Sequence, residues 1–253
     1  MSTMERFTIR AFRAPDEPGT CTSYIREHRR VLEDVGVSTI VDADQGWKDN
    51  DQVIVLVVEH DRLGLVGGIR LHYSNSARGL PMTDAIEKTD GGFSIELDRL
   101  IVDQIGEIGG LWNSSKIAGL GLPTVLSMAA VSLASQVKVG TLACFVAHYT
   151  MRHARKVGFT VLDSVGKDGT FNYPIEGITS IAMVIEDSIG LESAMEPYRH
   201  RIISLRLRPA QEVIESPAGI PMLVRYILHP SKSVVRMDKY GQINHLRTIM
   251  MRA

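Results

Sequence analysis

The stretch from Leu122 to Gln136, LPTVLSMAAVSLASQ, constrains the fold more than any other part of the chain. Its apolar residues fall on nearly every side of a helix, and Ala and Ser fill most of the remaining positions. A helix without a polar face has to be buried, here against a sheet. Pro123 suits the first helical turn, where a missing N–H costs no hydrogen bond. We therefore expect a mixed α/β domain built around this helix.

The six residues that precede this helix, Lys116 to Gly121, read KIAGLG. N–H groups at the start of a helix have no partner within it, and the helix dipole favours a negative charge there. Glycine lets an anion approach the backbone without a Cβ in the way. The loop therefore predicts a phosphate site. The alternative is that its two glycines only allow the helix to pack closely on the sheet.

Segments rich in β-forming residues surround the loop and the helix. The segments 52–60 and 63–73 are joined at DRLG, which predicts a β-hairpin. The other expected strands are 93–102, 106–113, 141–149, 159–166 and 221–229, and short helices are expected near 82–88 and at 150–158. Segment 178–187 is compatible with a strand or a helix, because periodicity does not separate the two in short apolar runs. Segment 22–36 predicts an amphipathic helix, and segment 193–208 is amphipathic as well.

Composition limits the class of protein. The chain has 253 residues, 44% of them hydrophobic, which is enough for one large domain or two small ones with a real core. The longest aliphatic run, VIVLVV, is too short to cross a bilayer, which takes about 20 residues. The N-terminus has no apolar segment of the signal-peptide type. We expect a soluble cytoplasmic protein without a membrane partner.

The cysteines and histidines predict neither a disulfide framework nor a metal site. Cys21 and Cys144 are the only two cysteines, and Cys144 lies in an apolar run that is typical of the core. His148 and His153 are five residues apart, so they would not share a helical face. We therefore expect no metal and no covalent acyl-cysteine.

Charge is unevenly distributed along the chain. Segment 198–253 contains ten Lys or Arg against three Asp or Glu, a balance of +7, whereas the whole chain carries -1. This pattern suggests an anionic partner such as a nucleotide phosphate, an acidic carrier protein or nucleic acid. A solvated face that pairs with the acidic remainder of the chain is an equally open alternative. No helix-turn-helix or aromatic stacking pattern accompanies the segment, so nucleic acid is not expected.

Two segments in order, GEIGGLWNSSKIAGLGLPTVL and TLACFVAHYTMRHARKVGFTVL, resemble the core of a GNAT-superfamily acyl-CoA N-acyltransferase. The loop of that family reads Gln/Arg-x-x-Gly-x-Gly/Ala. This chain has Lys116 at the Gln/Arg position and Gly119 and Gly121 at the small-residue positions. The family also has a later Gly-Phe pair, which matches Gly158 and Phe159.

The resemblance, which covers about residues 53–162, implies a fold and a donor. The fold is a mixed, largely antiparallel twisted sheet flanked by helices, spanning residues 1–190, with a basic C-terminal extension, 191–253, packed on the same domain. The donor is acyl-CoA, whose pyrophosphate the loop would hold while the preceding strand pairs with the pantetheine arm. The implied donor-binding residues are Leu111, Trp112, Asn113, Lys116, Ile117, Ala118, Gly119, Leu120 and Gly121.

A second similarity concerns the segments GGIRLHY and IELDRLIVD. Acyl-homoserine-lactone synthases and N-acyl amino acid synthases have an Arg on an earlier strand and Glu-x-x-Arg-x-x-Val on a later one. Arg70 and the run from Glu96 to Val102 match this pattern. The aromatic spacing of the N-terminal region of those enzymes is not reproduced, since Trp47 is the only Trp there. The similarity implies a long-acyl donor, bound to CoA or to an acyl carrier protein.

Acyl transfer to an amine requires a base for the amine and a proton for the leaving thiolate. Glu107, shortly before the loop, and Glu96, on the other expected strand, are the candidate bases. The alternative for each carboxylate is an ordinary ion pair with Arg70 or Arg99.

The proton-donating Tyr of the family would stand four residues before Gly158, where this chain has Ala154. Tyr149 is the expected substitute. His153 should point away, because a helix turns about 100° per residue. The predicted function is transfer of an acyl group from acyl-CoA, or acyl carrier protein, to the amine of a small molecule. The alternative is a module of the same fold that binds or senses an acyl thioester without catalysis.

Overall fold

The computed structural model describes residues 4–34, 36, 45–87, 90–174 and 177–230. The strands are β1 (Arg6–Arg13), β2 (Val53–His60), β3 (Gly64–Ser74), β4 (Gln104–Asn113), β5 (Val139–Ala147), β6 (Thr160–Val161), β7 (Thr170–Asn172), β8 (Thr179–Ile185), β9 (Ala210–Glu215) and β10 (Met222–Ile227). The helices are α1 (Pro18–Asp34), α2 (Pro81–Ile86), α3 (Phe93–Arg99), α4 (Leu122–Leu133), α5 (Met151–Lys156) and α6 (Glu196–Leu207). Short 3₁₀ turns lie at η1 (Ala14–Asp16), η3 (Gly46–Asp49), η4 (Ser115–Ile117) and η5 (Ala134–Val137).

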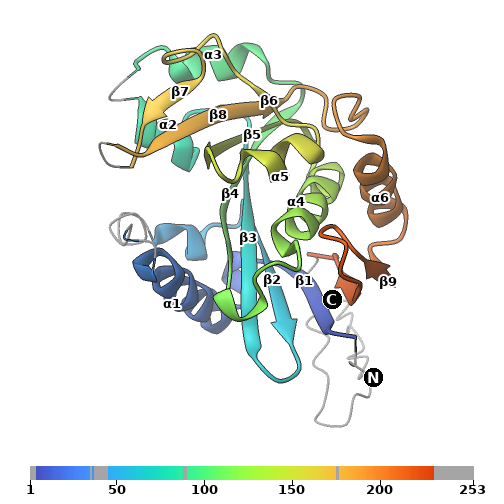
Figure 1. Ribbon diagram of the computed structural model, residues 1–253. Helices are drawn as coiled ribbons and strands as arrows, with labels where there is room; N and C mark the ends of the chain where they lie inside the picture. Colours follow the sequence, from blue (N-terminus) through green and yellow to red (C-terminus); the bar gives the residue numbers. More distant parts are fainter. Residues whose placement is uncertain (1–3, 35, 37–44, 88–89, 175–176, 231–253) are drawn as a thin grey trace, which may run out of the picture.

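The strands form one sheet in the order β6-β8-β5-β4-β3-β2-β1-β10-β9, and β7 pairs with β8 beside this path. β1 is parallel to β10 and β4 is parallel to β5, whereas the other pairs are antiparallel. Helices cover both faces: α1 lies on one side of the sheet, and α4 and α6 lie on the other (Figure 1). The prediction of a mixed, largely antiparallel sheet flanked by helices is confirmed.

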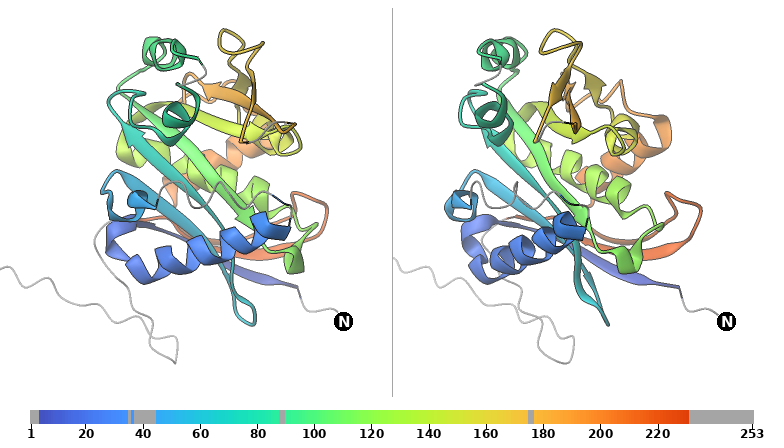
Figure 2. Two further views of the ribbon diagram at one scale, coloured as in Figure 1. Left: turned by 90° about the vertical axis from the view of Figure 1, so that its left-hand side faces the viewer. Right: turned by 60° about the vertical axis from the view of Figure 1, so that its left-hand side comes forward.

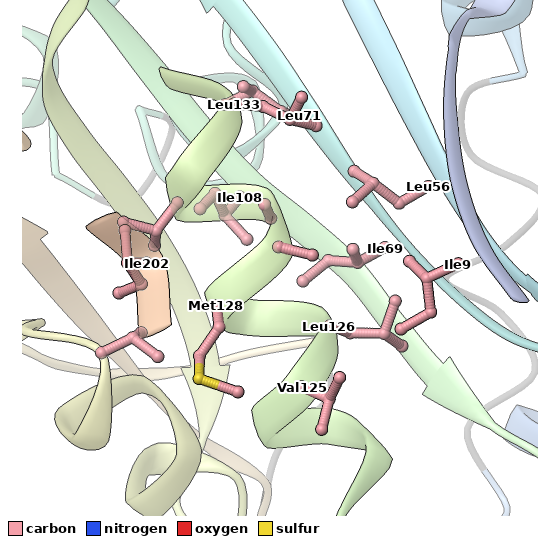
Figure 3. Close-up of a cluster of buried hydrophobic side chains, with 14 of the residues drawn as sticks. Ile9, Leu56, Ile69, Leu71, Ile108, Val125, Leu126, Met128, Leu133 and Ile202 are labelled. Carbon is pink, nitrogen blue, oxygen red and sulfur yellow. The ribbon is translucent and has the colours of Figure 1, made fainter. Parts of the chain in front are cut away.

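The apolar helix α4 is buried as its composition predicts. Apart from Pro123, all of its residues are buried, and Leu126 lies close to Ile69 of β3 and Ile9 of β1 (Figure 3). The opposite face of β2 packs against α1 through a separate cluster that includes Tyr24 and Trp47. In Figure 2, α1 crosses in front of the lower part of the strands, and α2 and α3 lie above it, near the upper end of the sheet. The sheet therefore has an α4 face and an α1 face.

Some predictions of secondary structure are wrong. Segment 93–102 is not a strand, because Phe93 to Arg99 form α3. Phe93 and Leu97, four residues apart, are buried while Ile95 is exposed, which is the helical period rather than the alternation of a strand. The helix expected at 22–36 begins earlier, at Pro18. Within 159–166 only β6 is a strand, and the ambiguous segment 178–187 contains strand β8.

The last described part of the chain is tied into the sheet. β10 pairs with β1, and Arg201 of α6 forms an ion pair of 2.9 Å with Glu215 of β9. The Tyr226 hydroxyl donates to the same carboxylate, also at 2.9 Å. The turn between β9 and β10 touches the glycine loop, since a Cβ on Gly121 would lie 2.7 Å from Cγ of Pro217. No described helix is long and apolar enough to cross a membrane.

Arg206 is part of the structure rather than a solvated cation. Its guanidinium donates to the carbonyl of Ile189 at 2.9 Å and to the carbonyl of Ser188, both in the segment after β8. Arg208 is exposed, and within the described part of the chain its side chain contacts only the Ser204 hydroxyl, at 3.3 Å. Half of the ten cations of the basic segment, Lys232, Arg236, Lys239, Arg247 and Arg252, lie outside the described residues.

We expect Arg206→Gln to lower the free energy of unfolding by about 1.5 kcal/mol, because charge-assisted hydrogen bonds to two backbone carbonyls are lost. Arg208→Gln should change it by less than about 0.5 kcal/mol, as is usual for an exposed side chain. Urea unfolding of both variants measures the difference. Equal losses in the two variants would contradict this assignment.

Candidate functional site

The sheet opens where β4 and β5 part. The two strands pair only from Gln104 to Glu107 on β4 and from Val139 to Ala143 on β5. β4 then continues to Asn113 and β5 continues to Ala147 without further pairing between them. Beyond this fork, the backbone edge of β4 that faces β5 and the edge of β5 that faces β4 have no strand partner, so a ligand can lie between the two strands.

A cavity of about 770 Å³ occupies this opening, within the usual size range of small-molecule sites. Residues 107–111 of β4 and residues 144–147 of β5 line it from the two branches of the fork. The remaining walls include residues of α1, η3, β3, α2, α4, α5 and β8. The cavity therefore lies at the fork and extends over the α1 face of the sheet.

Glu107 stands at the last paired position of β4, opposite Ala143 of β5 and His72 of β3. Its side chain is 6% exposed, lines the cavity and accepts a hydrogen bond of 2.7 Å from the Met82 N–H. Burial raises the pKa of Glu107 to about 7, although the Met82 N–H and the charge of Arg70 oppose the shift. A carboxyl with this pKa can take up a proton near neutral pH.

The glycine loop lies at the far end of β4 from the fork. The Ser114 side chain accepts from Lys116 N and starts the η4 turn. The backbone N–H groups of Gly119, Leu120 and Gly121 have no acceptor among the described residues. A Cβ at Gly119 would meet no atom within 4 Å, so the space in front of this backbone is open. The loop therefore presents unpaired N–H groups to an anion at the start of α4.

Arg70 faces the cavity from β3 on the same face of the sheet as Glu107. Its guanidinium carbon lies 4.4 Å from the centre of the Trp47 ring and 5.8 Å from the centre of the Tyr24 ring. Burial, assisted by the charge of Arg70, lowers the pKa of His28 to about 4 and that of His72 to about 3. Both imidazoles are therefore neutral at neutral pH, and Arg70 is the cation of this wall.

The structure brings some of the residues singled out from the sequence to the cavity and leaves others away from it. Leu111 lines the cavity, and so does Tyr149, which is 70% exposed after the end of β5. Trp112 packs instead against Tyr24 of α1, with ring centres 5.7 Å apart. Glu96, placed on a strand by the sequence analysis, stands on α3, forms an ion pair with Arg99 and is not a lining residue.

The loop residues divide according to burial. Ile117 is buried in the core, so only its backbone is available to a ligand. Lys116, Ala118 and Gly119 are exposed. The Asn113 side chain donates to the Ser114 carbonyl at 3.1 Å. This loop can therefore contact a donor through its backbone and the Lys116 side chain.

The expectation that His153 points away from the site is wrong. His153 lines the cavity, and its Nδ1 lies 2.7 Å from the Thr124 hydroxyl in the first turn of α4. Burial lowers the pKa of His153 to about 4, with Arg152 and Lys156 adding to the shift. Ala154, the next residue of α5, lines the cavity as well.

Tyr24, His28 and Met82 are site residues that the sequence did not predict. Met82 acts through its backbone N–H, which carries no residue-specific signal. Tyr24 and His28 lie one helical turn apart on α1, and that spacing identifies one face of the helix. Only the packing of α1 on β3 shows that this face borders the cavity.

No model of a protein family matches the chain, and no curated protein matches it in sequence. Solved structures match it in fold. FeeM, an N-acyl amino acid synthase from uncultured soil microbes, superposes with a TM-score of 0.54 and 14% identity, over 78% of this chain and 98% of FeeM.

Two further structures support the same fold. BjaI, a CoA-dependent acyl-homoserine lactone synthase solved with SAM and isopentyl-CoA, has a TM-score of 0.55 and 15% identity, over 78% of this chain and 89% of BjaI. An acyl-CoA N-acyltransferase from Pseudomonas aeruginosa has a TM-score of 0.50 and 15% identity, over 70% of this chain and 98% of that chain. The resemblance to GNAT-like N-acyltransferases predicted from the sequence is confirmed for the fold.

Proposed function

We propose that this protein is a GNAT-type N-acyltransferase that moves an acyl group from acyl-CoA to the amine of a small molecule. The observation that carries the proposal is Glu107, a buried carboxyl in the cavity wall at the point where β4 and β5 part. A base at that point would stand beside a thioester lying between the strands. The transferase domain in this proposal is residues 1–190, with 191–253 as an extension, and the protein is cytoplasmic.

The donor would lie along β4, from the fork to the glycine loop. The free N–H groups of Gly119, Leu120 and Gly121 would bind the pyrophosphate, with the exposed Lys116 nearby. From Ile108 onward β4 pairs with β3 but no longer with β5, and the edge that faces β5 would hydrogen-bond the pantetheine amides as a neighbouring strand does. No metal takes part in this proposal.

The acceptor amine would attack the thioester carbonyl carbon directly. Glu107 takes a proton from the amine as the C–N bond forms, and the C–S bond then breaks to release the thiolate of CoA. Tyr149 is the proposed proton source for the thiolate, because it lines the cavity and is exposed to solvent. His153 is a poorer acid because its lowered pKa keeps it neutral.

One observation favours the second candidate, a module that binds an acyl thioester without catalysis. Ala154 lines the cavity at the position where the family resemblance implies a proton-donating Tyr. An enzyme that releases CoA as the thiolate can function without this group, because water can supply the proton. Ala154 therefore leaves the transferase proposal in place and makes turnover the decisive measurement.

The test is release of free thiol from acyl-CoA in the presence of a panel of small amines. Thiol release that requires both the amine and the intact cavity supports the transferase. Saturable acyl-CoA binding without thiol release for any amine would favour the binding module. The same panel with acyl carrier protein as donor distinguishes the two forms of the thioester.

A further inference from the structure

His72 has a buried nitrogen without a partner. The residue is 7% exposed, and its Nε2 has no hydrogen bond within the described part of the chain. A buried polar atom without a partner costs free energy, so such atoms are rare in folded proteins. Burial, assisted by the charge of Arg70, lowers the pKa of His72 to about 3, so the ring is neutral at neutral pH. Its free nitrogen is therefore not explained by a charge.

The sheet places His72 directly beside Glu107. His72 on β3 is opposite Glu107 on β4 in the antiparallel pair, so the two side chains lie on the same face. The Cβ atoms of opposite residues are about 4.5–5.5 Å apart, which brings an imidazole and a carboxyl within reach of each other. Glu107 Oε2 accepts from the Met82 N–H, and Oε1 has no hydrogen bond among the described residues. Each of these two neighbours therefore has one atom without a partner.

A single proton would give both atoms a partner. An ionised carboxylate is only an acceptor, and Nε2 is an acceptor too when the imidazole proton is on Nδ1, so the two cannot bond to each other. A protonated carboxyl is a donor and can bond to Nε2. Burial of Glu107 favours its protonated form and raises its pKa to about 7. The partner of His72 would therefore be the O–H group of protonated Glu107.

We propose that His72 is a positioning residue for the base: its Nε2 accepts a hydrogen bond from Glu107 after Glu107 has taken a proton from the acceptor amine. The inference rests on the proposed N-acyltransferase function and adds the residue that orients its base. The N–H bond of the amine breaks and an O–H bond forms on Glu107, where the proton stays. A hydrogen bond made only by the protonated carboxyl makes Glu107 a stronger base and orients it in the transition state.

The test measures the pKa of Glu107 in the protein without substrate. NMR follows the carboxyl carbons of isotope-labelled glutamate across the neutral pH range, and the signal of Glu107 is the one that Glu107→Gln lacks. His72→Phe removes the acceptor but keeps an aromatic ring, and His72→Gln supplies an amide oxygen in its place. His60→Phe is the matched control, because His60 is also buried but contacts Glu5 at the other end of the β2–β3 hairpin.

His72→Phe should lower the pKa of Glu107 by about one pH unit, because the protonated carboxyl loses a hydrogen bond that the ionised form does not make. His72→Gln and His60→Phe should stay close to the wild-type value. In His72→Phe the acyl-transfer rate should level off at a lower pH, and the rate above that pH should fall about 3-fold or more because the base is weaker. A role of His72 in packing alone would change stability and leave this pKa in place.

The other ionisable groups near Glu107 are the same in all these variants, so the comparison isolates His72. They are Arg70 on β3, which has no ion-pair partner among the described residues, Asp84 on α2, Cys144 on β5 and Tyr173 after β7, with Tyr24 and His28 of α1 lining the same cavity.

Two results would overturn the inference. An unchanged pKa in His72→Phe would mean that no hydrogen bond joins the two groups, and a raised pKa would mean that His72 donates to the ionised carboxylate instead. If His72→Phe does not fold, the ring-nitrogen signals of wild type, assigned by their absence in His72→Gln, decide: a proton on Nδ1 supports the acceptor role and a proton on Nε2 overturns it. Absence of turnover with every amine would instead contradict the transferase function, and the pKa of Glu107 would still report the hydrogen bond to His72.

Discussion

Replacing Glu107 with Gln should lower the rate of acyl transfer about 100-fold or more, with little change in the affinity for the donor. Gln keeps an oxygen that can accept the hydrogen bond from Met82 N–H, so the change removes the base without removing the partner of that N–H. Steady-state kinetics and donor titration of the same preparation measure the two quantities. Glu192→Gln, at an exposed position, is the matched control.

The pH dependence of the acyl-transfer rate is a second test of the role of Glu107 as the base. A general base acts in its ionised form, and the pKa of Glu107 is raised to about 7. The wild-type rate should therefore rise as the pH increases and level off above about 7, and Glu107→Gln should lose this limb. Deprotonation of the amine contributes equally to both proteins, so the comparison between them isolates Glu107.

The raised pKa also has a consequence for stability. In the unfolded chain the pKa of this carboxyl is near its ordinary value of 4.5, whereas in the folded protein it is about 7. The contribution of Glu107 to stability is therefore present below pH 4.5 and is lost as the pH rises toward 7.

If Glu107→Gln leaves the rate of acyl transfer unchanged and Glu96→Gln lowers it, the base lies on α3 and the assignment of Glu107 is wrong.

Gly119→Asp should weaken donor binding by about 2 kcal/mol or more, because a carboxylate would stand in front of the N–H groups that would bind the pyrophosphate. The space for a side chain is open there, but the backbone has φ +84°, which L-residues rarely adopt. Gly119→Asn is the matched control, since Asn tolerates this conformation better than most residues and has nearly the same shape as Asp without its charge.

Titration of acyl-CoA into both variants measures the effect. A much larger loss for Gly119→Asp than for Gly119→Asn is expected, and the difference reports the charge. Equal losses would attribute the effect to the backbone conformation. Unchanged affinity in a folded Gly119→Asp variant would place the pyrophosphate elsewhere.

The parts of the fold with strong local signals could be predicted from the sequence. A run of apolar and small residues without a polar face predicts α4, and two β-rich runs around DRLG predict the hairpin of β2 and β3. α3 could not be predicted in this way, because over seven residues Phe93, Ile95 and Leu97 fit a strand as well as Phe93 and Leu97 fit a helix. Its helical form depends on which of these side chains finds a partner in the core.

Only those parts of the candidate site that are close together in sequence could be predicted. Glu107 and the glycine loop are neighbours in sequence, so the motif that predicts the loop also leads to the carboxyl. Trp47 and Arg70 meet only because β3 packs beneath α1 and η3, far away in sequence. Whether Arg70 has a counter-ion depends on every residue around it, and no local pattern contains that information.

Beyond the fork, β4 and β5 are not hydrogen-bonded to each other, so strand pairing is interrupted in the middle of the sheet. In most sheets, strand edges without a partner belong to the outermost strands, where they can pair with strands of other chains. Here the edge faces a cavity of about 770 Å³. A molecule that pairs with this edge would act as a removable strand, and at 100 times its dissociation constant it would stabilise the fold by about 2.7 kcal/mol. Binding would then complete the hydrogen bonding between strands at the centre of the sheet.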